Sequence, residues 1–439
     1  MKQTSFSNRK ILMRMFCVVI LLAVMSCTRT ADIYDSTKEI SRESKTKQEM
    51  SLEDKTIHLF SSLYNTSLRN GVTPTLSSLD STKTESPDTK LYLANFSEGG
   101  FMLFRDGGGE EMEVIGHSDE SSLHFSDGEK NPILGQIFRT SAGHIGFPTP
   151  KPSPFPNPNP DPNPNPYPGD TPPALQDYPK TVIESKSEPY IVKDFEPNTY
   201  QYFGQESPFN SLIINPLGRK SCPAGCGPIA IATLLSHYEM QAGGSRVDWK
   251  RLKDNYNYGT AEDVNLYYDI SLLSQLRVLV KDAWHYAHLW STDSFTLSTP
   301  DNISGYLERA GFNVTYVKGY KPGKICQILR DKHQPFILLG WSQDNDGKQA
   351  HYWVVDGLAR RVHKEYGHTI AYLGATPEPY ESEVSDNYYI HCTWGWYGDG
   401  NGWFSPRVIN DNEGISDDEL RSTHPKGEYY NISTFHIWK

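Results

Sequence analysis

The stretch Gly225-Cys-Gly-Pro-Ile-Ala-Ile-Ala-Thr-Leu-Leu235 decides how this chain is interpreted, because it places a thiol at the start of a helix too apolar to be exposed. Pro228 suits the first helical turn, where a missing N–H costs nothing. Main-chain N–H groups at a helix start carry partial positive charge, which favours a thiolate over a thiol. On its own, the stretch leaves two alternatives open for Cys226: a small core residue or a nucleophile.

Length and charge narrow the class of protein. A chain of 439 residues is expected to form two or three domains. A hydrophobic content of 37% and an aromatic content of 12% favour a globular, β-rich protein. The formal charge of -11 argues against nucleic acid or an anionic membrane surface as a partner.

The amino terminus is typical of a bacterial export signal. Its basic residues are Lys2, Arg9, Lys10 and Arg14. An apolar run from Met15 to Met25 follows and is too short to span a bilayer. Ser26 precedes Cys27, which resembles a lipobox, so we expect residues 1–26 to be a lipoprotein signal peptide and Cys27 to carry the lipid. An ordinary signal peptide cleaved nearby is the alternative.

The remaining cysteines do not suggest a disulfide framework or a metal site. After Cys17 and Cys27, the chain holds only Cys222, Cys226, Cys326 and Cys392. No Cys-x-x-Cys or Cys/His spacing indicates zinc, so neither a metal nor a cofactor is expected. A disulfide between Cys222 and Cys226 would cross a single turn at a helix start and is not expected.

Composition divides the chain after the signal into four parts: 27–50, 51–146, 147–174 and 175–439. The first is polar and is predicted to be a flexible tether. The second is predicted to be a small α+β domain. The third has proline at every second position from Pro148 to Pro168 and is predicted to be an extended linker. The fourth is the larger domain.

Within 51–146, Ser51 caps a predicted helix, and the runs 91–96 and 101–104 predict a hairpin across Ser97-Glu-Gly-Gly100. Val114-Ile115 and Ile133-Leu134 are interpreted as further β-type runs. In the larger domain, helices are predicted first and strands later. The predicted helices are 229–239, 266–284 and 303–310, and the predicted strands are 336–339, 352–355, 369–373, 388–391 and 429–438. This order predicts an α+β fold.

A nucleophilic cysteine needs a base, and the best context among the 14 histidines is His351-Tyr-Trp-Val-Val-Asp-Gly357. Here His351 opens a buried strand that is expected to end in an Asp356-Gly357 turn. His391 is the main competitor, since it lies on a strand beside an aromatic cluster. A third segment, Trp394-Gly-Trp396 with a glycine-rich turn, is consistent with core packing or with a wall that shields a polar contact.

In this order, the three segments resemble the streptopain family, which comprises bacterial cysteine peptidases with a papain-like fold. Phe203-Gly-Gln205 adds a fourth similarity, to the family's stretch that precedes the nucleophile. The resemblance implies an α+β papain-like domain with a helical half and an antiparallel β half. It also implies that residues 51–146 form an inhibitory prodomain.

Carried over by position, the resemblance implies that Cys226 is the nucleophile and His351 the general base and acid. Gln205 and the N–H of Cys226 would form the oxyanion hole, and Trp394 and Trp396 would wall the site. Thr393 stands where the family usually has Asn. A hydroxyl there can orient the imidazole less well than an amide, or a backbone carbonyl can serve instead.

The leading hypothesis is therefore an exported cysteine endopeptidase made as a zymogen. Its partners would be protein or peptide substrates, its own prodomain, and a membrane only through the lipid anchor. Two alternatives remain open: a catalytically impaired papain-like surface binding lipoprotein, supported by Thr393, and a cysteine transferase of the cell envelope. Residue Asp356 is interpreted as a turn residue rather than a member of a triad.

Overall fold

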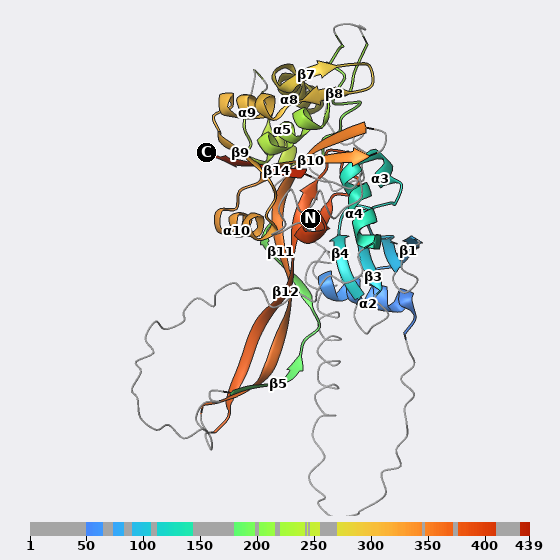
Figure 1. Ribbon diagram of the computed structural model, residues 1–439, viewed down its shortest axis with the longest axis vertical. Coiled ribbons are helices and arrows are strands. Elements are labelled where there is room, and N and C mark those ends of the chain that lie inside the picture. The colour runs from blue at the N-terminus through green and yellow to red at the C-terminus, as the bar shows by residue number, and fades with distance from the viewer. Residues whose placement is uncertain are drawn as a thin grey trace, which may run out of the picture. The chain divides into compact units, whose positions relative to one another are not determined.

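A computed structural model of the chain describes thirteen segments between Met50 and Lys439, which form one compact unit (Figure 1). These segments are 50–64, 73–82, 90–106, 112–143, 180–197, 202–215, 220–241, 244, 246–254, 270–344, 347–371, 376–409 and 431–439. The predicted signal peptide with Cys27, the tether and the proline-rich linker lie outside the described residues. No helix in the described segments is long and apolar enough to cross a membrane.

The amino-terminal segment, defined here as residues 50–143, begins with a helix and an antiparallel meander. The helix is α2 (Leu52–Tyr64), and the strands are β1 (Leu76–Thr82), β2 (Lys90–Phe96), β3 (Phe101–Asp106) and β4 (Met112–Ser118). Ser51 caps α2 by accepting the N–H of Asp54 at 3.1 Å, as predicted. The predicted hairpin is also confirmed, because β2 and β3 pair across a tight turn.

Ile133 and Leu134 were predicted as a β-type run, and this prediction is wrong. They lie in α4 (Pro132–Gly143), which follows the single turn α3 (Asp127–Lys130). The Oδ1 atom of Asn131 accepts the N–H groups of Ile133 and Leu134 at 3.0 and 3.3 Å, which caps the helix start. Pro132 then occupies the first turn, where it is best tolerated.

One large sheet contains the meander of the amino-terminal segment and the strands of residues 180–439. Its strand order is β1-β2-β3-β4-β13-β12-β11-β10-β14-β9, with β5 and β6 pairing with β11. The strands beyond the meander are β5 (Lys180–Lys186), β6 (Tyr190–Phe195), β9 (Asn313–Lys318), β10 (Phe336–Asp344), β11 (Gly347–Ile370), β12 (Glu378–Thr393), β13 (Gly402–Phe404) and β14 (Asn431–Trp438). The amino-terminal segment joins the rest of the sheet through the pairing of β4 with β13, in which Trp403 lies opposite His117 and Phe404 opposite Gly116.

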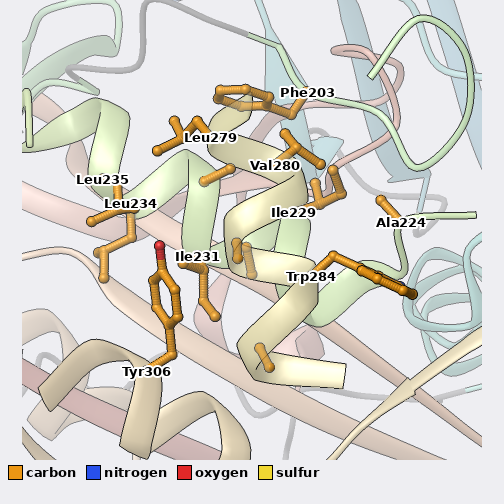
Figure 2. Packing of buried hydrophobic residues seen from close by; sticks show 14 of the residues in the cluster. Phe203, Ala224, Ile229, Ile231, Leu234, Leu235, Leu279, Val280, Trp284 and Tyr306 are labelled. Carbon is orange, nitrogen blue, oxygen red and sulfur yellow. The ribbon is translucent and has the colours of Figure 1, made fainter. Parts of the chain in front are cut away.

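A helical half packs against this sheet. Its helices are α5 (Cys226–His237), α6 (Trp249–Asp254), α8 (Ile270–Ala287), α9 (Pro300–Arg309) and α10 (Pro322–Lys332), with the short hairpin β7 (His288–Ser291) and β8 (Thr296–Ser298) and the turn α11 (Pro406–Ile409). Every residue of α5 after Cys226 is buried. Figure 2 shows Ile229, Ile231 and Leu234 of α5 packed with Leu279, Val280 and Trp284 of α8. The predicted α+β fold is confirmed, with a helical half and an antiparallel β half.

The predicted turn at Asp356-Gly357 is wrong, since the pair lies within β11, a single strand of 24 residues. The register against β12 shifts between Val355 and Gly357, so Asp356 is the extra residue of a β-bulge. Gly357 has no Cβ, and a Cβ there would lie 2.9 Å from both the His391 Cβ and the Trp403 ring. The bulge thus directs a carboxylate into the interior without ending the strand.

Candidate active site

The thiol of Cys226 lies at the first residue of α5, as the sequence predicted. Gly225 precedes it with a φ of 85°, and a Cβ at this position would meet the Thr296 side chain at 2.9 Å. The chain therefore needs glycine at 225 to turn into the helix while it packs against β8. The same close packing occurs at Gly227, beside Ser298.

Cys226 differs from the other described cysteines in its exposure. All four are free thiols, but Cys226 is partly exposed, whereas the others are buried; these are Cys222, Cys326 and Cys392. The Cys226 Sγ lies 4.0 Å from the carbonyl oxygen of Ala350, next to His351 in β11. Cys226 is thus the described thiol that a reagent or substrate can reach.

Two effects act against each other on the pKa of Cys226. Burial raises the pKa above its ordinary value, and main-chain N–H groups directed at the sulfur lower it. These N–H groups belong to Tyr352, to Cys226 itself and to Gly227. The helix start and strand β11 both supply donors to a thiolate, as expected for a nucleophile at a helix start.

The imidazole of His351 is buried between two tryptophans on β11 and the Trp-Gly-Trp loop. Its Nε2 lies 3.0 Å from the carbonyl oxygen of Trp394. A carbonyl only accepts, so Nε2 carries the hydrogen and Nδ1 of the neutral ring is left as the base. The ring stacks on Trp396, with centroids 6.1 Å apart and planes at 15°, and lies nearly parallel to the Trp353 ring at 6.3 Å.

Burial also governs the charge state of this imidazole. It lowers the pKa of His351 to about 4, and the hydrogen bond to Trp394 opposes the shift. Between residues 202 and 409, as far as the structure describes them, no hydrogen bond joins the His351 ring to the Cys226 sulfur. In this state the pair is a neutral thiol and a neutral imidazole.

Trp394 is held at two points, which fixes the carbonyl that faces His351. Its main-chain N–H donates to Oδ1 of Asn401 at 2.9 Å, and its ring Nε1 donates to the carbonyl of Gly400 at 2.8 Å. Gly395 follows with a φ of 81°, and a Cβ there would lie 2.7 Å from Ile229 of α5. The loop therefore passes directly over the nucleophile helix.

Thr393 does not orient the imidazole, which corrects the sequence prediction for this residue. Its hydroxyl donates to the carboxylate of Asp356, at 3.2 and 3.4 Å from the two oxygens. The same carboxylate, fully buried, lies 2.6 Å from Nδ1 of His391. Thr393 and His391 thus share one buried acid, and the acceptor that faces His351 is the carbonyl of Trp394.

Gln205 lies on a loop that two neighbouring segments hold beside the nucleophile. Its main-chain carbonyl accepts the N–H of Ala224 at 2.6 Å, two residues before Cys226. Gly204 forms a bridge with Trp396, and the Tyr397 N–H donates to the carbonyl of Phe203 at 3.0 Å. Gln205 itself is partly exposed. The structure thus places Gln205, Cys226, His351 and Trp396 around one locus.

Two residues of this locus were not singled out from the sequence, namely Tyr397 and Asn401. Both belong to the stretch that follows Trp396, where the many glycines indicated only a tight turn. In the described residues, no group of His, Cys, Asp or Glu side chains could hold a metal ion.

The amino-terminal segment covers the locus from the side of the sheet that bears His351. Gly340 pairs with His351 across β10 and β11, and a Cβ at 340 would lie 2.4 Å from the Ile133 side chain of α4. The Gly400 N–H donates to the carbonyl of Ser122 at 3.1 Å. Leu123 and Leu134 lie in the same apolar cluster as Trp394. This segment therefore contributes to the burial of the imidazole.

A partly exposed thiol at a helix start and an imidazole of fixed tautomer on the facing strand define the class of cysteine-type peptidases. Residues 203–404 match the model of the Peptidase C10 family, the streptopain family. The chain is a cysteine-type peptidase.

Two solved structures from Prevotella intermedia are similar to the chain. A prointerpain A fragment with an alanine substitution shares 13% identity, with a TM-score of 0.44, and the match covers 82% of this chain and 98% of that one. Active wild-type interpain A cysteine protease shares 15% identity, with a TM-score of 0.36, and the match covers 55% of this chain and 94% of that one. No curated protein matches the chain.

Proposed function

We propose that the chain is an exported cysteine endopeptidase, made as a zymogen, with Cys226 as nucleophile and His351 as general base and acid. The observation that carries the assignment is the 3.0 Å contact between His351 Nε2 and the Trp394 carbonyl, since it leaves Nδ1 as the basic nitrogen. The preceding residue, Ala350, has its carbonyl oxygen 4.0 Å from the Cys226 Sγ. The partial exposure of Cys226 among buried cysteines supports the same assignment.

In the proposed reaction, His351 Nδ1 takes the proton of the Cys226 thiol, and the sulfur attacks the peptide carbonyl carbon. The carbonyl oxygen then bears the negative charge, which the Gln205 amide and the Cys226 N–H stabilise. The C–N bond breaks, the leaving amine takes the proton from His351, and a thioester remains on Cys226. Water hydrolyses the thioester, with His351 acting again as base and then as acid.

The experiment that tests this assignment compares wild type, Cys226→Ala and Cys222→Ala on unfolded casein after removal of the amino-terminal segment. Wild type and Cys222→Ala should both release new amino termini, because Cys222 is buried. The Cys226→Ala variant should lose at least about a thousandfold of the rate, since no other group supplies the nucleophile. Equal turnover by all three would refute the assignment.

We also propose that residues 51–146 act as an intramolecular inhibitor and that 147–174 is the linker whose cleavage releases the peptidase, 175–439. The support is the contact of Ile133 with Gly340 opposite His351, and the hydrogen bond from Gly400 to Ser122. These contacts bury the imidazole, and burial favours its neutral form. Separation of the segment would restore water to the Cys226–His351 pair.

Cleavage in or just after the linker is tested by incubating the purified precursor and sequencing the new amino termini. A cut between residues 141 and 205 should accompany the appearance of activity. Activity that appears with the chain intact across this interval would contradict the proposal.

The proposed location is the cell envelope, with Cys27 as the lipid-bearing residue. The support is the sequence alone: the apolar run and Ser26-Cys27 after a basic start. Wild-type precursor should fractionate with membranes and take up labelled palmitate, whereas Cys27→Ser should do neither. Labelling of the Cys27→Ser variant to the wild-type level would contradict this location.

A further inference from the structure

Tyr397 adopts a backbone conformation that a bulky side chain rarely occupies. Its φ is 60°, and it is one of three described residues other than glycine with a positive φ, together with Glu239 and His333. A left-handed conformation is unfavourable for a residue with a Cβ. Such a residue persists only where its surroundings hold it, and it is a reason to look for a function.

The hydroxyl of Tyr397 supplies part of that hold through two hydrogen bonds to the main chain. It donates to the carbonyl oxygen of Ser207 at 2.8 Å and accepts the N–H of Glu206 at 3.0 Å. Burial raises the pKa of this phenol to about 12, so the proton stays on the oxygen. Because the hydroxyl both donates and accepts within the protein, we do not assign it a proton transfer to substrate.

The ring of Tyr397 occupies the space that a side chain at position 204 would need. A Cβ on Gly204 would lie 2.1 Å from the ring Cζ, so only glycine fits beneath it. The main-chain N–H of Tyr397 donates to the carbonyl of Phe203 at 3.0 Å. Hydroxyl, ring and backbone of one residue thus contact the chain on both sides of Gln205.

Gln205 is the position between these contacts, and its own carbonyl is held from the other side. That carbonyl accepts the N–H of Ala224 at 2.6 Å, in the stretch that leads into Cys226. Tyr397 therefore holds the flanks of Gln205, while the nucleophile loop holds its centre. The main chain at Gln205 is thus held on both flanks by Tyr397 and at its carbonyl by Ala224.

We propose that Tyr397 is a positioning residue, which holds the Phe203–Ser207 loop so that the Gln205 amide donates to the oxyanion. The inference rests on the proposed function, in which Gln205 and the Cys226 N–H form the oxyanion hole. Tyr397 does not touch the reacting atoms in this scheme. It acts through Gln205 alone, and that is the property which a test can isolate.

The test is a double-mutant cycle on the processed enzyme, with kcat and KM measured on a fluorogenic peptide amide. Gln205→Ala should lower kcat by about a hundredfold or more, since it removes one oxyanion donor. Tyr397→Phe keeps the ring over Gly204 and removes only the hydroxyl. It should lower kcat by about tenfold with KM changed by less than about twofold, because a small displacement of the donor weakens mainly the transition state.

The informative measurement is Tyr397→Phe in the Gln205→Ala background. If Tyr397 acts through Gln205, its substitution should then change kcat by less than about twofold. A merely structural role would give the same loss in both backgrounds. Tyr320→Phe is the matched control, because it removes a phenol that donates to the Pro406 carbonyl at 3.1 Å, away from this loop. It should leave kcat unchanged.

Each outcome decides between the inference and the function on which it rests. Additive losses in the double variant, or an unchanged kcat in Tyr397→Phe, overturn the positioning role while the peptidase assignment stands. An unchanged kcat in Gln205→Ala, with activity lost in Cys226→Ala, overturns the oxyanion role of Gln205 and the inference with it. Turnover that does not depend on Cys226 overturns the proposed function itself.

Discussion

Thr393 and Trp394 are neighbours in the chain, but only Trp394 contacts the imidazole of His351. The hydroxyl of Thr393 points to Asp356, and the carbonyl of Trp394 is directed at the imidazole. The absence of Asn at position 393 therefore removes no partner from His351, and the argument for an impaired enzyme loses its main support.

Substitution of Thr393 by Val should separate stability from catalysis. The change preserves the shape and removes the donor to the buried Asp356 carboxylate, which we expect to cost about 1–3 kcal/mol of unfolding free energy. The kcat at saturating substrate should stay within about threefold of wild type, because the contact of His351 with Trp394 is retained. Urea unfolding and steady-state kinetics measure the two effects, and Thr315→Val on β9 serves as control. A hundredfold loss of kcat without a loss of stability would show that Thr393 does orient the base.

Among the individual residues of the site, the sequence could predict only those that act through their side chains, not those that act through the main chain. Cys226 was identified because glycine, proline and apolar residues surround it, and His351 because it opens an apolar strand. The acceptor for His351 is a main-chain carbonyl, and every residue has one. Its identity depends on the path of the loop after Trp394, which Asn401 and Gly395 determine through contacts remote in sequence.

The helix α4 shows how one capping residue decides between two elements. Ile133 and Leu134 alone are compatible with a strand, but Asn131 accepts two main-chain N–H groups at the helix start. Asn131→Ala should therefore lower the unfolding free energy by about 1 kcal/mol, as is usual for a lost cap. Thermal unfolding of the wild-type and Asn131→Ala precursors measures this loss, and equal stability of the two precursors would contradict the prediction.

The strand β4 carries a buried histidine that should make the amino-terminal segment sensitive to acid. The Nδ1 atom of His117 hydrogen-bonds the Tyr64 hydroxyl, and its ring meets Tyr389 edge-on. Burial lowers the pKa of His117 to about 3, and electrostatic interactions with Lys193, His391 and Arg361 act in the same direction. The ring is thus neutral in the folded unit and is protonated more readily once it is exposed.

The direction in which pH changes the stability of the precursor follows from the lowered pKa of His117. Its contribution to stability is complete above the ordinary value of 6.5 and falls as the pH decreases towards 3. Between pH 7.5 and 5, the precursor should lose about 2 kcal/mol from this group. His117→Gln keeps an acceptor for Tyr64 without a titrating ring, so its loss over the same interval should be smaller by that amount. Urea midpoints at the two pH values measure it, and identical losses in both proteins would contradict the prediction.

Element by element, periodicity and caps predicted α2, the β2–β3 hairpin and the nucleophile helix. They did not predict the full length of β11, because the Asp356-Gly357 pair is typical of a turn. The pair forms a bulge instead, since His391 and Thr393 bind the carboxylate inside the protein. Such a contact between strands is not visible in a local pattern.

At the scale of the whole molecule, separation of the amino-terminal segment should activate the Cys226 thiol. Burial raises the pKa of Cys226 and lowers that of His351, so exposure of the pair to water should move both pKa values back and favour the thiolate with the imidazolium. Alkylation by iodoacetamide at pH 7 should therefore become at least about tenfold faster after cleavage of the linker. In Cys226→Ala, residues 175–439 should take up no label in either form, because Cys222, Cys326 and Cys392 are buried. Equal rates of labelling at Cys226 before and after cleavage would contradict the expectation.

The order of helices and strands along the chain, together with the resemblance to the streptopain family, predicts the α+β class from the sequence alone. The continuity of the sheet from the amino-terminal segment into the catalytic half was not predicted. It depends on Trp403 and Phe404, a short strand in a glycine-rich stretch with no alternation to reveal it. Pairing between strands remote in sequence is the part of a fold that local patterns determine least.

The pairing of β4 with β13 consists of only two residue pairs, whereas the apolar clusters shared across it are large. Few main-chain hydrogen bonds of the sheet therefore have to break when the amino-terminal segment separates from residues 180–439, and most of the newly exposed surface is apolar. Exposure of apolar surface raises the heat capacity, so the affinity between these two parts should weaken on cooling. Sulfate, which strengthens apolar burial, should hold them together, and a calorimeter would register their separation as a positive change in heat capacity.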